Sequence, residues 1–166
     1  MKIAEYKKII KKPLRPRTLV FLITDDQVLL GMKKKGLGKG NWVGIGGKAE
    51  KGETIEGAAK REVAEEIHVN VSELEKVAIL NFYFPHIKDE DWNQQVHVFI
   101  TKTWKGDPKE SEEIQPQWFK KSELPFDSMW DDAPYWLPKV LDNYKLEAEF
   151  ILDEKLKVVD YVQHSL

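Results

Sequence analysis

Two spacings of apolar residues alternate along the 166-residue chain and predict two kinds of element. Short runs rich in β-branched and aromatic side chains, separated by turn residues, are typical of strands. These runs lie at Thr18–Thr24, Gln27–Lys34, Val77–Phe84, Val96–Trp104, Gln117–Phe119, Glu147–Asp153 and Lys155–Val162. Asp25-Asp26 predicts a tight turn that joins the first two runs in a hairpin, and the last two form a closing hairpin.

A helical spacing begins at Thr54. At about 100° per residue, five apolar side chains form one arc that we expect to face the core: Ile55, Ala58, Ala59, Val63 and Ile67. A second helix is expected over Pro134–Tyr144. Asp131-Asp132 precedes it and is expected to cap it.

The first helix carries acidic residues on the face that should be buried. Glu62 and Glu66 fall inside the apolar arc, and Glu65 lies at its edge. A buried, unpaired carboxylate is costly, so three together require a cation. Oxygen ligands alone indicate Mg²⁺, or Mn²⁺. The alternative is a solvated acidic face with Arg61 and Glu65 in an i,i+4 pair, but the phase of the apolar arc argues against it.

The segment around this helix resembles the Nudix box of hydrolases that act on nucleoside diphosphate derivatives. The matching positions are Gly47, Glu53, Arg61-Glu62-Val63, Glu65-Glu66 and Val69. His68 stands where the family has glycine at the end of the helix. Asn70 is an alternative turn residue, so the sequence predicts a shifted helix end with the chemistry unchanged.

The resemblance implies an α/β/α sandwich around a central mixed β-sheet. It also implies that Glu53 pairs with Arg61 and orients the metal carboxylates. The metal ligands that it implies are Glu62, Glu65, Glu66, the Gly46 carbonyl and Glu113.

Further segments, some of which overlap the box, resemble the branch of this family that hydrolyses oxidised purine nucleoside triphosphates. They are Leu30–Lys34, Gly44 with Gly46–Lys48, Gly52–Ile55, Val96–Phe99, Pro116 with Trp118-Phe119, Met129-Trp130 and Tyr135-Trp136. The substrate-binding positions that this resemblance implies are Thr18, Lys33, Val43, Gly47, Lys48, Phe82, Phe84, Trp130, Asp131 and Asp132. Trp130 is expected to stack on the base.

Two positions differ from that branch, and both are expected to touch the base. Val43 replaces an asparagine, and Ala133 replaces the second of two adjacent aspartates. Asp131 stands in place of a proline, so the aspartate pair is shifted by one residue. The preference for an 8-oxo base is therefore the least determined part of the resemblance, whereas the phosphate chemistry is unaffected.

A lysine- and glycine-rich loop precedes the box and contains Gly36, Gly38 and Gly40. Backbone N–H groups and ammonium charges in such a loop suit phosphate groups. Alone the composition indicates only a loop, but its position before Gly46-Gly47 favours the phosphate interpretation.

Composition narrows the remaining possibilities. Residues 1–17 are basic and are expected to form a solvated or edge-packed arm, with 18–166 as a single domain. A formal net charge of −2 gives no electrostatic case for a nucleic-acid or membrane partner. The absence of cysteine excludes thiol catalysis and disulfides. We expect a cytoplasmic monomer whose partner is a small nucleotide.

The sequence thus predicts Mg²⁺-dependent hydrolysis of purine nucleoside triphosphates, oxidised ones such as 8-oxo-dGTP included, to the monophosphate and pyrophosphate. One alternative is a Nudix enzyme acting on an ordinary nucleotide, a dinucleotide or a capped RNA. The other is a binding module without turnover, which the complete set Glu53, Glu62, Glu65 and Glu66 disfavours.

Overall fold

The computed structural model describes residues 1–166 and contains three α-helices, eight strands and two short 3₁₀ turns. The helices are α1 (Ile3–Lys7), α2 (Ile55–Ile67) and α3 (Ala133–Leu141), and the 3₁₀ turns are η1 (Glu90–Trp92) and η2 (Phe126–Ser128). The strands are β1 (Arg15–Leu22), β2 (Gln27–Lys33), β3 (Trp42–Val43), β4 (Glu75–Tyr83), β5 (Gln94–Thr101), β6 (Ile114–Lys120), β7 (Leu146–Leu152) and β8 (Val158–Ser165). None of the helices has the length and apolar character that a membrane crossing requires.

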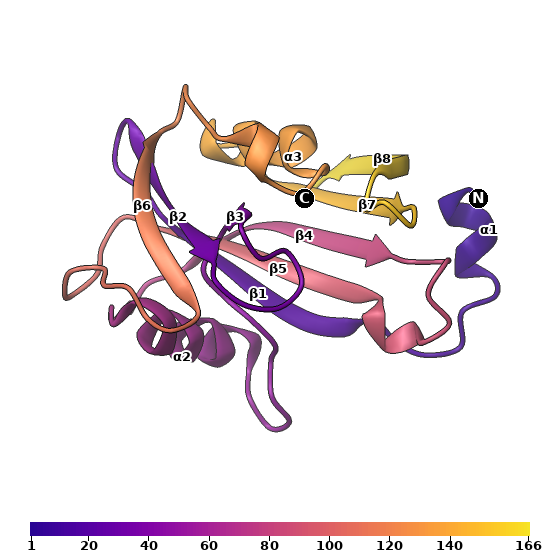
Figure 1. The fold of residues 1–166 in the computed structure, drawn as a ribbon, viewed down its shortest axis with the longest axis horizontal. Coiled ribbons are helices and arrows are strands. Elements are labelled where there is room, and N and C mark those ends of the chain that lie inside the picture. Colours follow the sequence, from indigo (N-terminus) through magenta and orange to yellow (C-terminus); the bar gives the residue numbers. More distant parts are fainter.

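The strands form two sheets (Figure 1). The larger sheet has the order β1-β5-β4-β7-β8, with β1 parallel to β5 and β4 parallel to β7, while its other pairs are antiparallel. The smaller sheet, β3-β2-β6, is antiparallel throughout. The larger sheet confirms the expected central mixed sheet, and the closing hairpin is present as β7 and β8.

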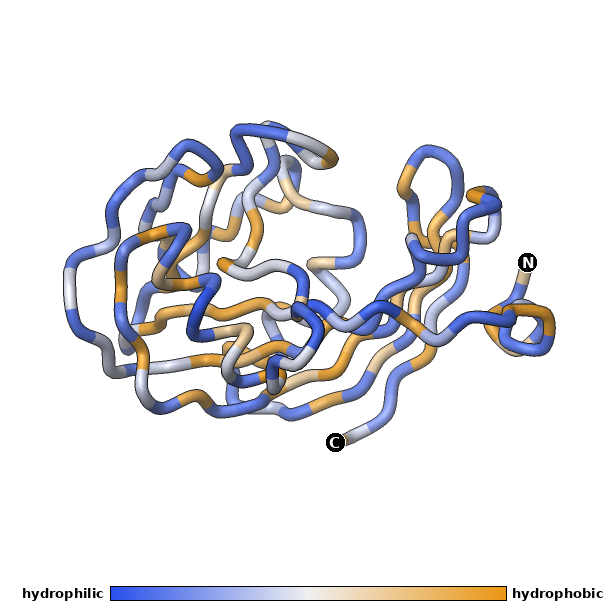
Figure 2. The backbone as a smooth tube through the Cα atoms, turned by 90° about the horizontal axis from the view of Figure 1, so that it is seen from below, coloured by the Kyte–Doolittle hydropathy of each residue, from blue (hydrophilic) through white to orange (hydrophobic).

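Helices cover the two faces of the larger sheet, with α2 on one face and α3 on the other (Figure 1). Strand β1 packs on both helices because successive side chains of a strand point to opposite faces. Val20 and Leu22 pack with Val63 of α2, whereas Phe21 packs with Trp136 of α3. The hydrophobic segments accordingly run through the strands, and the connecting loops are mostly hydrophilic (Figure 2). The three layers confirm the expected sandwich.

The hairpin predicted around Asp25-Asp26 is wrong. The turn itself exists, because Thr24 N donates to Gln27 O at 3.0 Å. Beyond a single bridge between Ile23 and Val28, however, β1 and β2 diverge into different sheets. Both strands are buried on both faces, so their local pattern carries no information about which strand is the partner.

The basic arm is more ordered than its charge suggests. The boundary expected after residue 17 lies inside β1, which begins at Arg15 because its register with β5 begins there. Ahead of it, Ile3 and Tyr6 of α1 are buried against Tyr83. The helical spacing of Ile3 and Tyr6 was the available signal, and the surrounding lysines obscured it.

Helix α2 begins and ends where its local chemistry requires. The Thr54 hydroxyl accepts a hydrogen bond from Gly57 N at 3.0 Å and caps the helix. His68 ends it in the left-handed conformation at φ 60° and ψ 35°, with its N–H bonded to Ala64 O. The predicted shift of the helix end to Asn70 is therefore wrong: histidine itself adopts the glycine conformation.

Candidate active site

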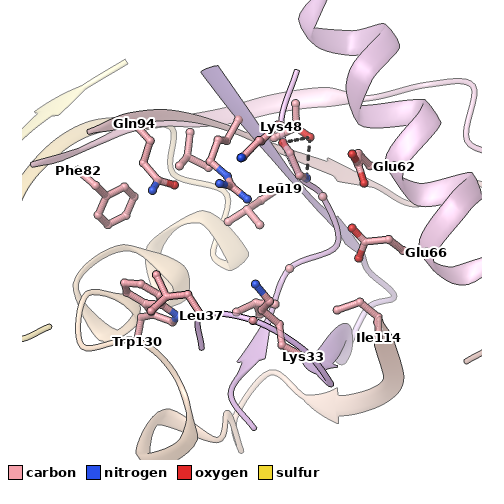
Figure 3. A pocket seen from close by; sticks show the side chains of 18 of the residues that line it. Leu19, Lys33, Leu37, Lys48, Glu62, Glu66, Phe82, Gln94, Ile114 and Trp130 are labelled. Carbon is pink, nitrogen blue, oxygen red and sulfur yellow. Dashed lines mark hydrogen bonds between the residues drawn. The ribbon is translucent and has the colours of Figure 1, made fainter. Parts of the chain in front are cut away.

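A cavity of about 640 Å³ opens between the two sheets and receives residues from both of them, from α2 and from the segment before α3. Figure 3 shows Glu62 and Glu66 of α2 on one side of it and Phe82, Gln94 and Trp130 on the other, while Lys33 lies between. The volume lies within the range of small-ligand sites. The cavity therefore has a carboxylate end and an aromatic end.

Two glycines place the backbone directly against the carboxylate end. Thr18 N of β1 donates to Gly47 O at 2.9 Å. A Cβ atom on Gly46 would lie 1.9 Å from Thr18 O, and one on Gly47 would lie 2.7 Å from the Glu62 carboxyl group. No side chain fits at Gly46, because the clash is with the backbone of β1, whereas a side chain at Gly47 would displace the Glu62 carboxylate. Gly46 is thus required for the backbone to pass this close to β1, and Gly47 leaves the Glu62 carboxylate its place.

Three of the acidic residues predicted as metal ligands line the cavity: Glu62, Glu66 and Glu113. Only 7% of Glu66 is exposed. Burial, together with the neighbouring carboxylates of Glu62 and Glu113, raises the pKa of Glu66 well above its ordinary range, and the Lys33 ammonium opposes this. A divalent cation bound here would relieve that repulsion.

Arg61 lies behind the carboxylates and connects them. It donates to both oxygens of Glu53, at 2.7 and 2.9 Å, to Glu62 at 3.0 Å and to Glu65 at 3.2 Å. Its hydrogen bonds are the main cause that lowers the pKa of Glu53 to about 2. The Arg61–Glu53 pair predicted from the sequence is present, and neither of the two residues lines the cavity.

Glu65 is the predicted ligand that the structure does not bring to the cavity. Its carboxylate bonds Arg61 and its side chain is 61% exposed, because it lies at the edge of the arc that faces the core. No three His, Asp or Glu side chains converge in an arrangement that would hold an ion as they stand. The donors that face the cavity, Glu62, Glu66, Glu113 and the Gly46 backbone, supply only oxygen and suit a hard cation.

The aromatic end contains Phe82 and Phe84 from β4 and the strand end that follows it, together with Trp130. The lysine- and glycine-rich loop closes over Trp130. A Cβ atom on Gly38, whose φ is 84°, would lie 3.0 Å from Trp130 Nε1. Leu37 from the same loop lines the cavity beside the indole (Figure 3). The loop thus contributes to the aromatic end of the cavity.

The two aspartates before α3 point in different directions. Asp132 lines the cavity but is only 4% exposed, and its carboxylate accepts from Trp136 Nε1 at 2.8 Å. Burial raises the pKa of Asp132 to about 6, which the Trp136 hydrogen bond opposes. Asp131 instead accepts from Val158 N at 2.8 Å and does not line the cavity. The shifted pair therefore offers the cavity one carboxylate, and neither side chain makes the expected cap bond.

All other predicted substrate-binding residues line the cavity: Thr18, Lys33, Val43, Gly47, Lys48, Phe82, Phe84 and Trp130. Sequence reasoning missed Arg17, Leu37 and Gln94, which also line it. The period-two spacing of Arg17, Leu19 and Phe21 was a usable signal, since it places all three on one face of β1. Gln94 donates its amide to Trp92 O at 3.3 Å, so its Oε1 is left for a ligand.

A glycine loop against an acidic helix, in a three-layer fold, defines the class of this protein, and the family described as NUDIX domain matches residues 13–140. The chain belongs to the NUDIX-domain family. It is 42% identical over 147 residues to the oxidized purine nucleoside triphosphate hydrolase of Mus musculus, covering 87% of this chain and 90% of that protein. The Danio rerio protein of the same name is 40% identical over 150 residues, covering 86% and 94%. The crystal structure of a Mutator MutT protein from Bacillus halodurans superposes with a TM-score of 0.77 at 27% identity, covering 90% of this chain and 97% of that one.

Proposed function

We propose that this protein hydrolyses oxidised purine nucleoside triphosphates, such as 8-oxo-dGTP, to the monophosphate and pyrophosphate. The observation that carries the proposal is the two-ended cavity, in which acidic helix residues face an aromatic wall. A purine fits the aromatic end. At the other end, a cation held by the carboxylates would bind the charged triphosphate. The identity of 42% and 40% to two oxidized purine nucleoside triphosphate hydrolases supports the choice of substrate.

Each end has a distinct part in this reaction. Trp130 provides a flat π-face against which a purine stacks, and the Asp132 carboxylate lies close enough to the cavity to accept a hydrogen bond from the base. At the opposite end Lys33 has no carboxylate partner and is directed into the cavity (Figure 3). It is therefore placed to neutralise phosphate oxygens.

A Mg²⁺ or Mn²⁺ ion would be held by Glu62 and Glu66, with Glu113, Glu65 and the Gly46 carbonyl as further ligands. When bound, such an ion neutralises phosphate charge and lowers the pKa of a coordinated water. Arg61 holds Glu62 by one hydrogen bond and Glu65 by another, so it restricts the positions that both carboxylates can take. Glu65, Glu66 and Glu113 remain the candidates for the base that takes up a proton from water.

The proposal extends to the state of the protein. Residues 18–166 act as one domain, onto which the preceding arm packs through Ile3 and Tyr6. We propose a monomer that acts on a small nucleotide in the cytoplasm, without a stable nucleic-acid partner. The formal net charge of −2 supports a free nucleotide over a polymer.

The test is a pyrophosphate-release assay with Mg²⁺ over 8-oxo-dGTP, 2-oxo-dATP, dGTP and dATP. We expect pyrophosphate release with Mg²⁺, and we expect the highest kcat/KM for an oxidised purine nucleoside triphosphate. A dinucleotide and a capped RNA serve as comparisons, and their hydrolysis is followed by chromatography of the nucleotide products because it releases no pyrophosphate. If either is hydrolysed faster than all four triphosphates, the substrate class proposed here is wrong; if none of the six compounds is hydrolysed, the proposed activity is wrong.

A further inference from the structure

Arg17 differs from the other two arginines of the chain in having no partner. Arg15 bonds Asp91 at 2.8 Å, and Arg61 bonds Glu53 at 2.7 Å. The Arg17 guanidinium makes no hydrogen bond or ion pair within the protein, although it is half-buried and lines the cavity. No fully buried side-chain nitrogen lacks a partner, so the Arg17 nitrogens open onto the cavity.

The strand fixes where this guanidinium lies. Arg17 pairs with Val96 of β5 on one side and bridges to Lys48 on the other, so its backbone is held from both directions. Val96 lies next to the aromatic end, because Gln94, two residues earlier on the same strand, is paired with Phe82. Arg17 therefore lies between the two ends of the cavity, where the sugar and the first phosphate of a nucleotide would meet.

The charges around Arg17 favour a further anion in the cavity. Burial lowers the pKa of Arg17, which the more distant carboxylates of Glu62 and Glu66 oppose. Burial also lowers the pKa of Lys33, and the positive charge of Arg17 adds to that effect. Two cations thus repel each other inside one cavity, and neither contacts a carboxylate. A phosphate group placed between them would remove the repulsion and supply acceptors for the guanidinium fork.

We propose that Arg17 binds the phosphate group closest to the sugar of the bound nucleotide. This inference rests on the proposed function for the identity of the ligand but assigns a residue that neither the Nudix box nor the resemblance includes. The guanidinium offers only donors, and it lies within reach of the charges at the carboxylate end, which favours phosphate over the base. Reading of a purine oxygen is the competing role, and the measurements below separate the two.

The test compares the affinity for nucleotides with the affinity for the matching nucleosides, measured by calorimetry without metal. The probes are 8-oxo-dGMP with 8-oxo-deoxyguanosine, and dGMP with deoxyguanosine. For Arg17→Gln we expect about 10- to 100-fold weaker binding of both monophosphates, as for a lost hydrogen bond between charged groups, and unchanged binding of both nucleosides. Arg17→Lys should recover part of the loss. The matched control is Arg15→Gln, on the same strand but outside the cavity, and it should bind as the wild type.

The outcomes are distinct. If Arg17→Gln bound either nucleoside more weakly, or lost affinity for only one of the two monophosphates, Arg17 would read the base and the proposal would be overturned. Unchanged monophosphate affinity in Arg17→Gln would overturn it as well. If the wild type releases no pyrophosphate from oxidised purines but the loss of monophosphate affinity is seen, the proposed function fails and the role of Arg17 stands. Because Arg17 has no partner to lose, Arg17→Gln should keep or raise the Tm; were it to unfold, Arg17→Lys would carry the comparison.

Discussion

The two ends of the cavity are built in different ways. At the carboxylate end, Glu62 and Glu66 come from one helix, and the glycine loop that faces them directly precedes it. At the aromatic end, Phe82 and Gln94 come from the paired strands β4 and β5, and Trp130 comes from the segment before α3. The helix and the glycine loop of the first end are thus set by local spacing, whereas the second end forms only when separate segments of the chain have packed together.

The two ends of the cavity should also respond differently to amino-acid substitution. A helix that presents two carboxylates to one point depends on its phase and on Arg61 behind it, so each of these residues is constrained by the others. A wall assembled from separate segments can exchange one side chain at a time, as the replacements at Val43 and Ala133 illustrate. We therefore expect changes at the carboxylate end to alter the rate for every substrate, and changes at the aromatic end to alter the choice among substrates.

The largest effect is expected at Glu66. Glu66→Gln keeps the shape but removes a charge that would hold the metal, so kcat should fall by at least about 1000-fold, equivalent to about 4 kcal/mol. Because burial and Glu62 already disfavour the charged form, the variant should keep or raise the Tm. Pyrophosphate release and thermal unfolding check both parts. A variant that retained more than about a tenth of the wild-type rate, a loss of only about 1.4 kcal/mol, would exclude Glu66 as a metal ligand.

Arg61→Ala should have the next largest effect. Its hydrogen bonds hold Glu53, Glu62 and Glu65, and loss of such a supporting partner typically costs about 10- to 100-fold in metal affinity or activity. The apparent affinity for Mg²⁺ in a titration of activity should weaken, while the ratio of kcat/KM between 8-oxo-dGTP and dGTP should stay constant. Lys60→Ala, at the adjacent position of the same helix, is the control. A changed ratio would mean that Arg61 reaches the substrate.

The contrast also explains how much the sequence could predict. The core face of α2, the Arg61–Glu53 pair and the mixed sheet followed from the periodicity of the helix and from a motif that occupies one short segment. The direction of the Glu65 side chain could not be predicted, because a residue at the edge of an apolar arc can point either into the cavity or toward Arg61. The partner of β1 could not be predicted either, since β1 and β2 are buried on both faces.

At the aromatic end the prediction depended on resemblance and was weakest where the chain differs. Asp131 was expected beside Asp132 in the pocket, but adjacent residues at the start of a helix point in different directions, and Asp131 bonds the backbone of Val158 instead. Arg17 was assigned to a solvated arm because its neighbours are basic. Its period-two spacing with Leu19 and Phe21 instead places Arg17 on the face of β1 that lines the cavity.

A smaller effect on stability is expected from the buried Asp132. Its pKa of about 6 in the fold exceeds the ordinary value of 3.8, so the native state binds the proton more tightly than the unfolded state. The contribution of Asp132 to stability is therefore lost as pH rises from about 4 to 6 and does not change further above that range. Asp132→Asn removes this titration and keeps an oxygen for Trp136. Relative to the wild type, its free energy of unfolding should rise between pH 4 and pH 7 by about 1–3 kcal/mol, measured by urea unfolding.

The same variant connects stability with selectivity. If Asp132 accepts a hydrogen bond from the base, Asp132→Asn should change the ranking of 8-oxo-dGTP, 2-oxo-dATP and dGTP more than it changes the dependence on Mg²⁺. A difference in unfolding free energy that did not vary with pH would show that Asp132 titrates normally in the fold. An unchanged ranking would show that it supports Trp136 without reading the base.

The smallest effect is expected at Val43, which lines the cavity where the resembling branch has an asparagine. Apolar walls discriminate weakly between purines, whereas a polar group that loses its partner with the wrong base discriminates more strongly. One neutral hydrogen bond is worth about 0.5–1.5 kcal/mol, so Val43→Asn should raise the kcat/KM ratio of 8-oxo-dGTP to dGTP by about 2- to 10-fold.

Val43→Ala changes the volume without adding a hydrogen-bonding group and should leave the ratio near that of the wild type. Competition kinetics with both substrates in one mixture resolve differences of this size. If Val43→Asn and Val43→Ala gave the same ratio, the base would be read elsewhere on the aromatic side, and the free Oε1 of Gln94 would be the next position to change.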